Sequence, residues 1–336
     1  MIDKDALVLV TGAGGFIGGH LVADLIERGF RRIRAVDRKP FEDWHQLFQG
    51  VDNRVRDLAL KECCDDVCAG TNAIFNLAAD MGGMGFIETH KAECMLSVLI
   101  STHMLTAARD AGTERFFYSS SACVYAADRQ TEADVVPLAE HMAYPAMPED
   151  GYGWEKLFSE RMCRHFHEDY GLVTRVARYH NVYGPHGTYE GGREKAPAAI
   201  CRKVIEAVQS GRNSIEIWGD GEQTRSFTYI SECVLGTQMI MNSDIGEPLN
   251  LGSEELVTIN QLVDIVEDIA GVRLKRVYNL DAPKGVRGRN SDNSLILEKL
   301  GWAPSVHLRD GMEQTYRWIH DRIAGVQPRV ADRIAV

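Results

Sequence analysis

The sequence predicts an α/β fold, in which a doubly wound parallel sheet is joined by a smaller, interleaved C-terminal domain. Two observations lead to this prediction. Short apolar segments of strand length alternate with amphipathic helical segments up to about residue 180, as parallel strands with crossover helices require. Beyond that point glycine and proline turn signals become frequent, which indicates a second structural unit.

The first unit alternates strand and helix from residue 6 onward. Leu7–Val10 is short and apolar, as a buried parallel strand is, and a helix with Leu21, Leu25 and Ile26 on one face follows it. Gly29 is the expected stop, because glycine adopts the left-handed conformation common at helix ends. The predicted strands are 7–10, 33–36, 73–77, 115–118 and 174–177, and the predicted helices are 16–28, about 93–111 and about 152–170.

The second unit is predicted to consist of loops with scattered short elements. Asn181–Pro185 and Trp218–Gly221 are its clearest turn signals. We expect it to be interleaved with the last strands of the first unit. The predicted boundaries are residues 1–180 plus about 226–252 for a nucleotide-binding domain, and residues 181–225 and 253–330 for a substrate-binding domain.

Composition argues against several classes of protein. The chain of 336 residues carries a formal net charge of -11, so a nucleic-acid backbone would be repelled. No apolar run approaches the ~18 residues of a membrane helix, and the start, Met1–Asp5, lacks the basic region of a secretion signal. The 8 scattered cysteines suit reduced thiols, and Cys64 and Cys68 lack the further ligands of a metal site. We therefore expect a cytoplasmic protein with no membrane, nucleic-acid or metal partner.

A glycine-rich turn joins the first strand to the first helix. Gly12, Gly15 and Gly18 are spaced so that a tight turn can form, the backbone can approach a pyrophosphate, and the helix can pack on the sheet. The free N–H groups of the helix N-terminus then bind the phosphates. Asp37 ends the second strand, where its carboxylate can accept hydrogen bonds from an adenosine ribose and would repel a 2′-phosphate. The pattern predicts NAD as the cofactor, although Arg38 could instead bind the 2′-phosphate of NADP.

Tyr152 and Lys156 stand four residues apart and so share one face of a predicted helix. A lysine ammonium beside a phenol, together with the positive nicotinamide of NAD⁺, favours the phenolate and makes tyrosine a usable base. Taken alone, the pair is equally well explained by an exposed helix face. With the glycine turn and with Ser119–Ser121 at a predicted strand end, it resembles the Ser-Tyr-Lys set of short-chain dehydrogenase/reductases. The resemblance implies that Ser121 binds the reacting oxygen, Tyr152 transfers its proton, and Lys156 tunes Tyr152 and holds the ribose.

Longer segments narrow this resemblance: Leu77–Ile87, Ser120–Tyr125, Gly191–Ala199, Trp218–Phe227 and Gly285–Asn293. They are similar to segments of the GDP-mannose 3,5-epimerases, and the similarity covers roughly residues 6–320. It implies a Rossmann-type NAD-binding domain, a nucleotide-sugar substrate and an isomerase activity. One segment departs from the pattern, since Met95–Val98 stands where plant-like members carry a paired Asn that braces the active-site helix.

Cys123 is the most discriminating position in these segments. Related 4,6-dehydratases have Glu there and UDP-galactose-type 4-epimerases have Thr, whereas the 3,5-epimerases have Cys, as this chain does. A thiol becomes a competent carbon base when adjacent cations stabilise its thiolate. The resemblance makes Lys195 the matching acid on the opposite face of the sugar. The implied reaction oxidises C4 transiently to a ketone and inverts C3 and C5 by proton exchange. The alternative interpretations are that Cys123 is a buried packing residue and that Lys195 is a solvated surface lysine.

The resemblance also assigns the remaining ligand-binding residues. Arg225 and Arg287 are the expected diphosphate or sugar-nucleotide contacts, because charge-assisted arginine contacts suit phosphate geometry. The predicted cofactor-binding residues are Gly12, Gly15, Phe16, Ile17, Gly18, Asp37, Asp57, Tyr152 and Lys156. The predicted substrate-binding residues are Gly82, Ser121, Ala122, Cys123, Asn181, Glu194, Lys195, Ala196, Lys203, Gln223, Arg225 and Arg287.

Two other function classes compete with a 3,5-epimerase. Another C4-oxidising enzyme, such as a 4-epimerase or a heptose-modifying relative, is one, but a pure 4-epimerase would not need both Cys123 and Lys195. A non-catalytic NAD-binding scaffold is the other, but it would need none of the catalytic side chains intact. The sequence leaves the nucleotide base and the sugar open. The helices at about 93–111 and 152–170 carry apolar residues beyond what one sheet face needs, which predicts a homodimer.

Overall fold

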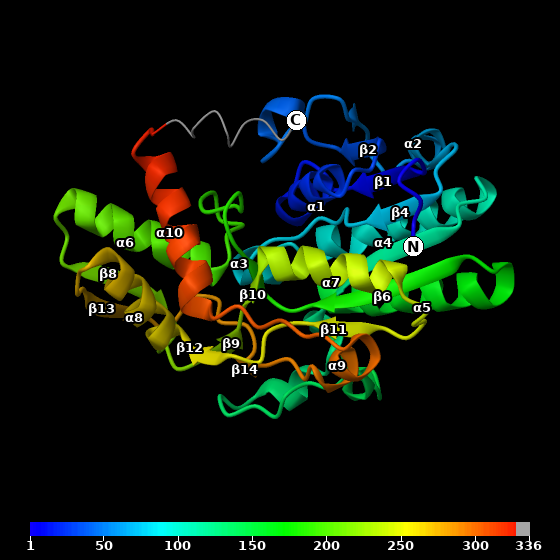
Figure 1. Cartoon of the computed structure of the whole chain (residues 1–336). Helices are drawn as coiled ribbons and strands as arrows, with labels where there is room; N and C mark the ends of the chain where they lie inside the picture. Colours follow the sequence, from blue (N-terminus) through cyan, green and yellow to red (C-terminus); the bar gives the residue numbers. More distant parts are fainter. Residues whose placement is uncertain (327–336) are drawn as a thin grey trace.

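In the computed structural model, which describes residues 1–326, seven parallel strands form a central sheet (Figure 1). Their order is β11-β6-β5-β4-β1-β2-β3. The strands β1, β2 and β3 are therefore added in sequence toward one edge of the sheet, and β4, β5, β6 and β11 toward the other. A reversal of this kind opens a crevice at the carboxyl ends of the strands beside it. The predicted doubly wound parallel sheet is confirmed. The strands are β1 (Leu7–Thr11), β2 (Arg32–Asp37), β3 (Asp52–Val55), β4 (Ala73–Asn76), β5 (Arg115–Ser121), β6 (Val173–Tyr179) and β11 (Leu249–Leu251).

Helices cover both faces of this sheet because successive strand residues point to opposite sides. In β1, Val8 and Val10 belong to the hydrophobic cluster under α1 (Phe16–Glu27) and α7 (Ile230–Asn242). Leu9 belongs to the cluster on the other face, under α2 (Lys61–Cys68), α4 (Lys91–Asp110) and α5 (Tyr152–Tyr170). Within residues 1–326, no helix has both the length and the apolar character needed to cross a bilayer.

The elements predicted for the first 180 residues are confirmed, with ends shifted by a few residues, while β3, α2 and the short helix α3 (Met84–Thr89) were not predicted. The expectation of short scattered elements beyond residue 180 is wrong. That part of the chain contains α6 (Ala196–Ser210), α8 (Ile259–Ala270) and α10 (Leu308–Ile323), besides α7. In α8 the apolar side chains follow the helical repeat, Thr258 and Gln261 form a capping box, and Gly271 ends the helix in the left-handed conformation.

The second unit adds short strands and helices beside the sheet (Figure 1). Residues 327–330, at the end of the predicted substrate-binding domain, lie outside the described residues. The strands beside the main sheet form three small sheets. They pair β8 (Ser214–Trp218) with β13 (Lys275–Asn279), β9 (Thr224–Ser226) with β12 (Leu256–Thr258) and β14 (Gly288–Arg289), and β7 (Val182–Tyr183) with β10 (Thr228–Tyr229). Two short helices are α3 (Met84–Thr89) and α9 (Ser294–Leu300).

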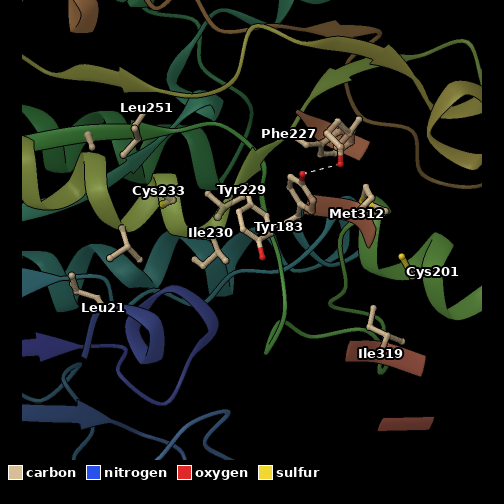
Figure 2. Packing of buried hydrophobic residues seen from close by; sticks show 14 of the residues in the cluster. Leu21, Tyr183, Cys201, Phe227, Tyr229, Ile230, Cys233, Leu251, Met312 and Ile319 are labelled. Carbon is tan, nitrogen blue, oxygen red and sulfur yellow. Dashed lines mark hydrogen bonds between the residues drawn. The ribbon is translucent and has the colours of Figure 1, made fainter. Parts of the chain in front are cut away.

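One continuous hydrophobic core joins the two units (Figure 2). It runs from Leu21 of α1 through Cys233 of α7 and Tyr183 of β7 to Met312 of α10. The hydroxyl of Tyr183 donates a hydrogen bond to the carbonyl of Leu308, 3.1 Å away, at the start of α10. The crevice at the carboxyl ends of the strands is therefore bounded on its far side by the second unit, which shares a hydrophobic core with the sheet.

Candidate active site

Glycine is required at positions 12, 14 and 18, in and just after the turn between β1 and α1. Gly12 has a φ of +68°, and a Cβ atom at Gly18 would overlap the carbonyl oxygen of Gly12. A Cβ atom at Gly14 would lie 2.7 Å from the indole ring of Trp44. Helix α1 begins at Phe16 with no side-chain cap, which leaves the N–H groups of its first turn available to an anionic ligand. These features fit the pyrophosphate of a dinucleotide.

A cavity of about 450 Å³ opens above this turn, at the carboxyl ends of the sheet strands. Asp37 lies at the end of β2, and its carboxylate accepts a hydrogen bond from the backbone of Lys39 at 3.0 Å. Asp57 lines the same cavity. All predicted cofactor-binding residues line this cavity: Gly12, Gly15, Phe16, Ile17, Gly18, Asp37, Asp57, Tyr152 and Lys156.

Arg38 is engaged by a carboxylate inside the protein. Its guanidinium lies 2.9 Å from the Asp80 carboxylate, which also forms an ion pair with the guanidinium of Arg193 at 2.7 Å. These two guanidinium groups hold the pKa of Asp80 below its usual range, against the opposing effect of burial. Both Asp37 and Arg38 line the cavity, but the charge of Arg38 is paired with Asp80 while the Asp37 carboxylate has no ion-pair partner recorded among residues 1–326, which favours NAD over NADP.

Ser121, Tyr152 and Lys156 meet where the cavity reaches the end of β5. The ammonium of Lys156 is buried, donates a hydrogen bond to the carbonyl of Ser119 at 3.0 Å, and lies 5.4 Å from the centre of the Tyr152 ring. Glu155 provides a carboxylate 3.7 Å from the same ammonium. The arrangement places a buried cation directly beneath the phenol.

Burial raises the pKa of Tyr152 well above its ordinary value, and a hydrogen bond with Ser121 opposes this increase. The phenol of the protein alone therefore keeps its proton. The shift toward the phenolate that the sequence predicts is thus opposed by burial in the protein alone.

A second cavity of about 350 Å³ adjoins the first and shares Ser121, Tyr152 and Lys195 with it. It lies between the sheet edge and the second unit. All but one of the predicted substrate-binding residues line it: Gly82, Ser121, Ala122, Cys123, Asn181, Glu194, Lys195, Ala196, Lys203, Gln223 and Arg225.

Arg287 is the predicted residue that does not line this cavity. Its guanidinium forms two hydrogen bonds with the Asp220 carboxylate, at 2.8 and 2.9 Å, on the outside of the site. Arg289, two residues further on, lines the cavity instead and donates a hydrogen bond to the sulfur of Cys123 at 3.6 Å. Arg289 belongs to the segment Gly285–Asn293 that is similar to the 3,5-epimerases, but it was not among the predicted substrate-binding residues.

Arg225 is buried and directs its guanidinium at backbone carbonyls. It donates to Val286 at 2.6 Å and to Lys284 at 3.2 Å, so it ties the segment that carries Arg289 to β9. Burial lowers the pKa of Arg225 to about 10. Arg225 therefore shapes the cavity wall, and its expected contact with the diphosphate stays a prediction.

Cys123 and Lys195 lie in the same cavity on different elements. Cys123 is on the short turn after β5, with its thiol among buried side chains that include Phe86 and Tyr152. Lys195 immediately precedes α6, where burial lowers its pKa and the negative charge of a Cys123 thiolate would raise it. An ammonium with a lowered pKa gives up its proton more readily, as a general acid must.

The segment that departs from the family pattern still braces the site. Ser97 is buried in α4, and its hydroxyl accepts a hydrogen bond from the backbone N–H of Asp80 at 2.9 Å. This contact holds the start of the loop that carries Gly82. Within residues 1–326, no cluster of three or more His, Cys, Asp or Glu side chains is arranged to hold a metal ion.

The glycine turn, the Ser-Tyr-Lys set and the crevice of the sheet define a dinucleotide-dependent enzyme. The chain belongs to the NAD-dependent epimerase/dehydratase family, whose model matches residues 8–252, and its cofactor is NAD. It is 45% identical to GDP-mannose 3,5-epimerase of Arabidopsis thaliana over 98% of this chain and 86% of the relative. It is 47% identical to GDP-mannose 3,5-epimerase 1 of Oryza sativa subsp. japonica over 94% of this chain and 82% of that relative.

A solved structure supports the same fold. UDP-glucose 4-epimerase from Thermotoga maritima, determined with UDP-glucose, superposes with a TM-score of 0.84 and is 26% identical, covering 94% of this chain and 99% of that one. The chain is therefore an NAD-dependent epimerase whose sequence relatives include GDP-mannose 3,5-epimerases and whose structural neighbours include a 4-epimerase.

Proposed function

We propose that this enzyme inverts C3 and C5 of GDP-mannose through a transient 4-keto sugar. The observation that carries the proposal is the second cavity, in which a thiol and a lysine from separate elements adjoin the Ser-Tyr-Lys set. The relatives named GDP-mannose 3,5-epimerase support the choice of substrate and of carbons. In this proposal the first cavity holds NAD and the second holds the nucleotide sugar.

The redox step belongs to Ser121, Tyr152 and Lys156. Ser121 donates a hydrogen bond to the C4 oxygen, and Tyr152 takes the proton of the C4 hydroxyl when its phenolate is stabilised by Lys156. NAD⁺, when bound in the first cavity, would supply the acceptor for the C4 hydride and the donor for its return. Tyr152 then gives its proton back to the C4 oxygen, so the residues end the cycle as they began it.

The inversion steps belong to Cys123 and Lys195. The C4 ketone acidifies the neighbouring C–H bonds, because the electrons left behind are delocalised onto its oxygen as an enolate. The Cys123 thiolate removes a proton from one face and becomes a thiol. The Lys195 ammonium delivers a proton to the opposite face of the same carbon and becomes a neutral amine, which completes one inversion. Before the second carbon is inverted, the Cys123 thiol releases its proton to solvent water and the Lys195 amine takes one from solvent water, which restores the thiolate and the ammonium.

The division into domains belongs to the same proposal. Residues 1–180 plus about 226–252 would bind NAD, and residues 181–225 and 253–330 would bind the nucleotide sugar. The glycine turn and Asp37 support the first part, and the cavity wall built from α6, β8 and β9 supports the second. The 8 free thiols suit a reducing compartment, so we also propose a cytoplasmic location.

Exchange with D₂O tests the division of labour. In Cys123→Ser a hydroxyl of much higher pKa replaces the thiol, so C5 should acquire deuterium about 10²–10⁴-fold more slowly while C4 oxidation survives. Absorbance of the reduced cofactor on addition of GDP-mannose reports oxidation, and NMR of the recovered sugar reports exchange. Tyr152→Phe should show neither signal.

Cys94→Ser is the matched control, because Cys94 is a buried thiol of the same hydrophobic cluster that does not line the second cavity. Wild-type exchange at C3 and C5 in Cys123→Ser would refute the assigned role of the thiol. A 4-epimerase, the second candidate favoured by the Thermotoga maritima structure, would invert C4 and leave C3 and C5 free of deuterium.

We further propose a homodimer formed through α4 and α5, which pack side by side (Figure 1). These helices expose large apolar side chains on their outer surface: Met95, Leu96 and Leu99 on α4, and Trp154 and Phe158 on α5, each between 40% and 59% exposed. A second copy related by a two-fold axis would bury this surface in a four-helix seam.

Sedimentation velocity tests the dimer. Leu96→Glu places a charge in the centre of the seam and should give a monomer, whereas Leu297→Glu, an equally exposed leucine on α9, should leave the dimer intact. A wild-type mass equal to one chain at all concentrations would contradict the proposal.

A further inference from the structure

Cys123 is held in a closed ring of contacts that the mechanism above does not use. The Arg289 guanidinium donates to the Cys123 sulfur at 3.6 Å and to the side-chain oxygen of Gln130 at 2.7 Å. Its other terminal nitrogen forms an ion pair with Glu149. The backbone N–H of Glu149 in turn donates to the Cys123 carbonyl at 3.0 Å, which closes the ring.

Arg289 is buried, and Glu149 is nearly so. The side chains of Arg289 and Glu149 are 6% and 11% exposed, so little water screens either one. A buried guanidinium without a counter-ion is strongly unfavourable, and Glu149 supplies the only carboxylate recorded in an ion pair with it among residues 1–326. Glu149 therefore fixes the position of the Arg289 guanidinium, and in that position the guanidinium contacts the Cys123 sulfur.

We propose that Glu149 is a positioning residue that acts through Arg289, holding its guanidinium against the Cys123 sulfur and setting the net charge there. This inference rests on the proposed role of Cys123 as a base. Arg289 favours the thiolate because it contacts the sulfur directly, and Glu149 moderates this effect from the other side of the guanidinium. The sulfur thus has one contacting cation, whose charge is partly neutralised by Glu149 on the far side of the guanidinium.

Other charged or titratable groups also face the sulfur, and they are the same in every variant considered below. Tyr152 faces it from α5 and Arg225 from β9, and Lys195 faces it from the segment before α6. Differences among variants at positions 149 and 289 therefore isolate the ring itself.

The test is the pH dependence of Cys123 alkylation in the NAD-bound enzyme without substrate. Iodoacetamide reacts with the thiolate, and mass spectrometry of the Cys123 peptide separates this thiol from the other seven cysteines. Arg289→Gln removes the contacting cation, so the midpoint should move to higher pH by about 1–3 units. Glu149→Gln removes the negative charge but keeps an oxygen for Arg289, so the midpoint should move to lower pH.

Three further variants separate position from charge. Glu149→Ala releases Arg289, so its midpoint should lie above that of Glu149→Gln. Arg289→Lys keeps the cation and should recover part of the shift of Arg289→Gln. Asp150→Asn is the matched control, because this neighbouring carboxylate is 73% exposed and pairs with Lys91 at the surface, so its midpoint should equal that of the wild type.

An unchanged midpoint in both Arg289→Gln and Glu149→Gln would overturn the inference, as would equal midpoints in Glu149→Gln and Glu149→Ala. These outcomes are distinct from failure of the proposed function. If Cys123→Ser kept full deuterium exchange while the midpoints shifted as expected, the ring would be real and the thiol would not be the base.

Discussion

The two cavities of this enzyme are built in opposite ways. The cofactor cavity contains one local strand–turn–helix unit, in which Gly12 has a φ of +68° and Gly18 leaves no space for a Cβ atom. The second cavity is made of side chains that come from segments far apart in the sequence and are fixed by contacts such as that of Arg225 with the carbonyl of Val286. The first should therefore tolerate almost no added atoms, whereas the second should be sensitive to lost hydrogen bonds and charges.

Gly18→Val should have the largest effect. Its side chain would overlap the carbonyl of Gly12, so the turn cannot close around a pyrophosphate. We expect NAD affinity to fall at least about 1,000-fold, or about 4 kcal/mol, by isothermal titration. Gly246→Ala is the control, because a Cβ there meets no atom within 4 Å. Tight NAD binding by Gly18→Val would show that the turn is not rigid.

Acidification should destabilise the structure next to the second cavity. Burial lowers the pKa of His180, which precedes Asn181, from 6.5 to about 4. As pH falls from 6.5 to 4, the unfolded chain takes up this proton and the folded one does not, so stability declines. The loss from this residue should total about 3 kcal/mol.

His180→Gln removes this titration. The free energy of unfolding in urea is measured for the variant and the wild type across pH 4–7, and the difference between the two isolates the contribution of His180. The lowered pKa values of His20 and His45 remain in both proteins. Parallel pH profiles for variant and wild type would contradict the prediction.

Arg225→Lys should affect the second cavity alone. Lysine cannot reproduce the forked contacts with Lys284 and Val286, so the segment carrying Arg289 loses its anchor. We expect KM for GDP-mannose to rise about 10-fold, which corresponds to about 1.4 kcal/mol. NAD affinity should stay at the wild-type value, and an equal loss in both affinities would show that the two cavities are not independent.

Asp37→Asn should have the smallest effect, confined to the cofactor cavity. An amide still accepts one hydrogen bond from the ribose but no longer repels a 2′-phosphate. We expect NAD affinity to fall about threefold and the preference for NAD over NADP to narrow. Titration with both cofactors measures this, and an unchanged preference would assign the discrimination to another residue.

The contrast between the cavities also explains what could be predicted from the sequence. The cofactor residues are specified by spacing within one turn and by strand ends, so all of them line the first cavity. Arg289 was missed and Arg287 chosen because the pairing of Arg287 with Asp220 spans 67 residues and exists only in the folded chain. The helices beyond residue 180 were missed although the capping box of Thr258 and Gln261 lies in the sequence, because glycine and proline turns outweighed it.

Gly153 follows Tyr152 at the start of α5, and a Cβ there would overlap the carbonyl oxygen of Cys123. Backbone thus rests directly on backbone between the helix that bears the phenol and the turn that bears the thiol. The residues that oxidise the sugar and the residues that transfer its protons are consequently positioned by the same backbone contact. Any change that lifts α5 from the sheet alters the alignment of both groups at once, so neither chemistry can be adjusted by moving this helix without disturbing the other.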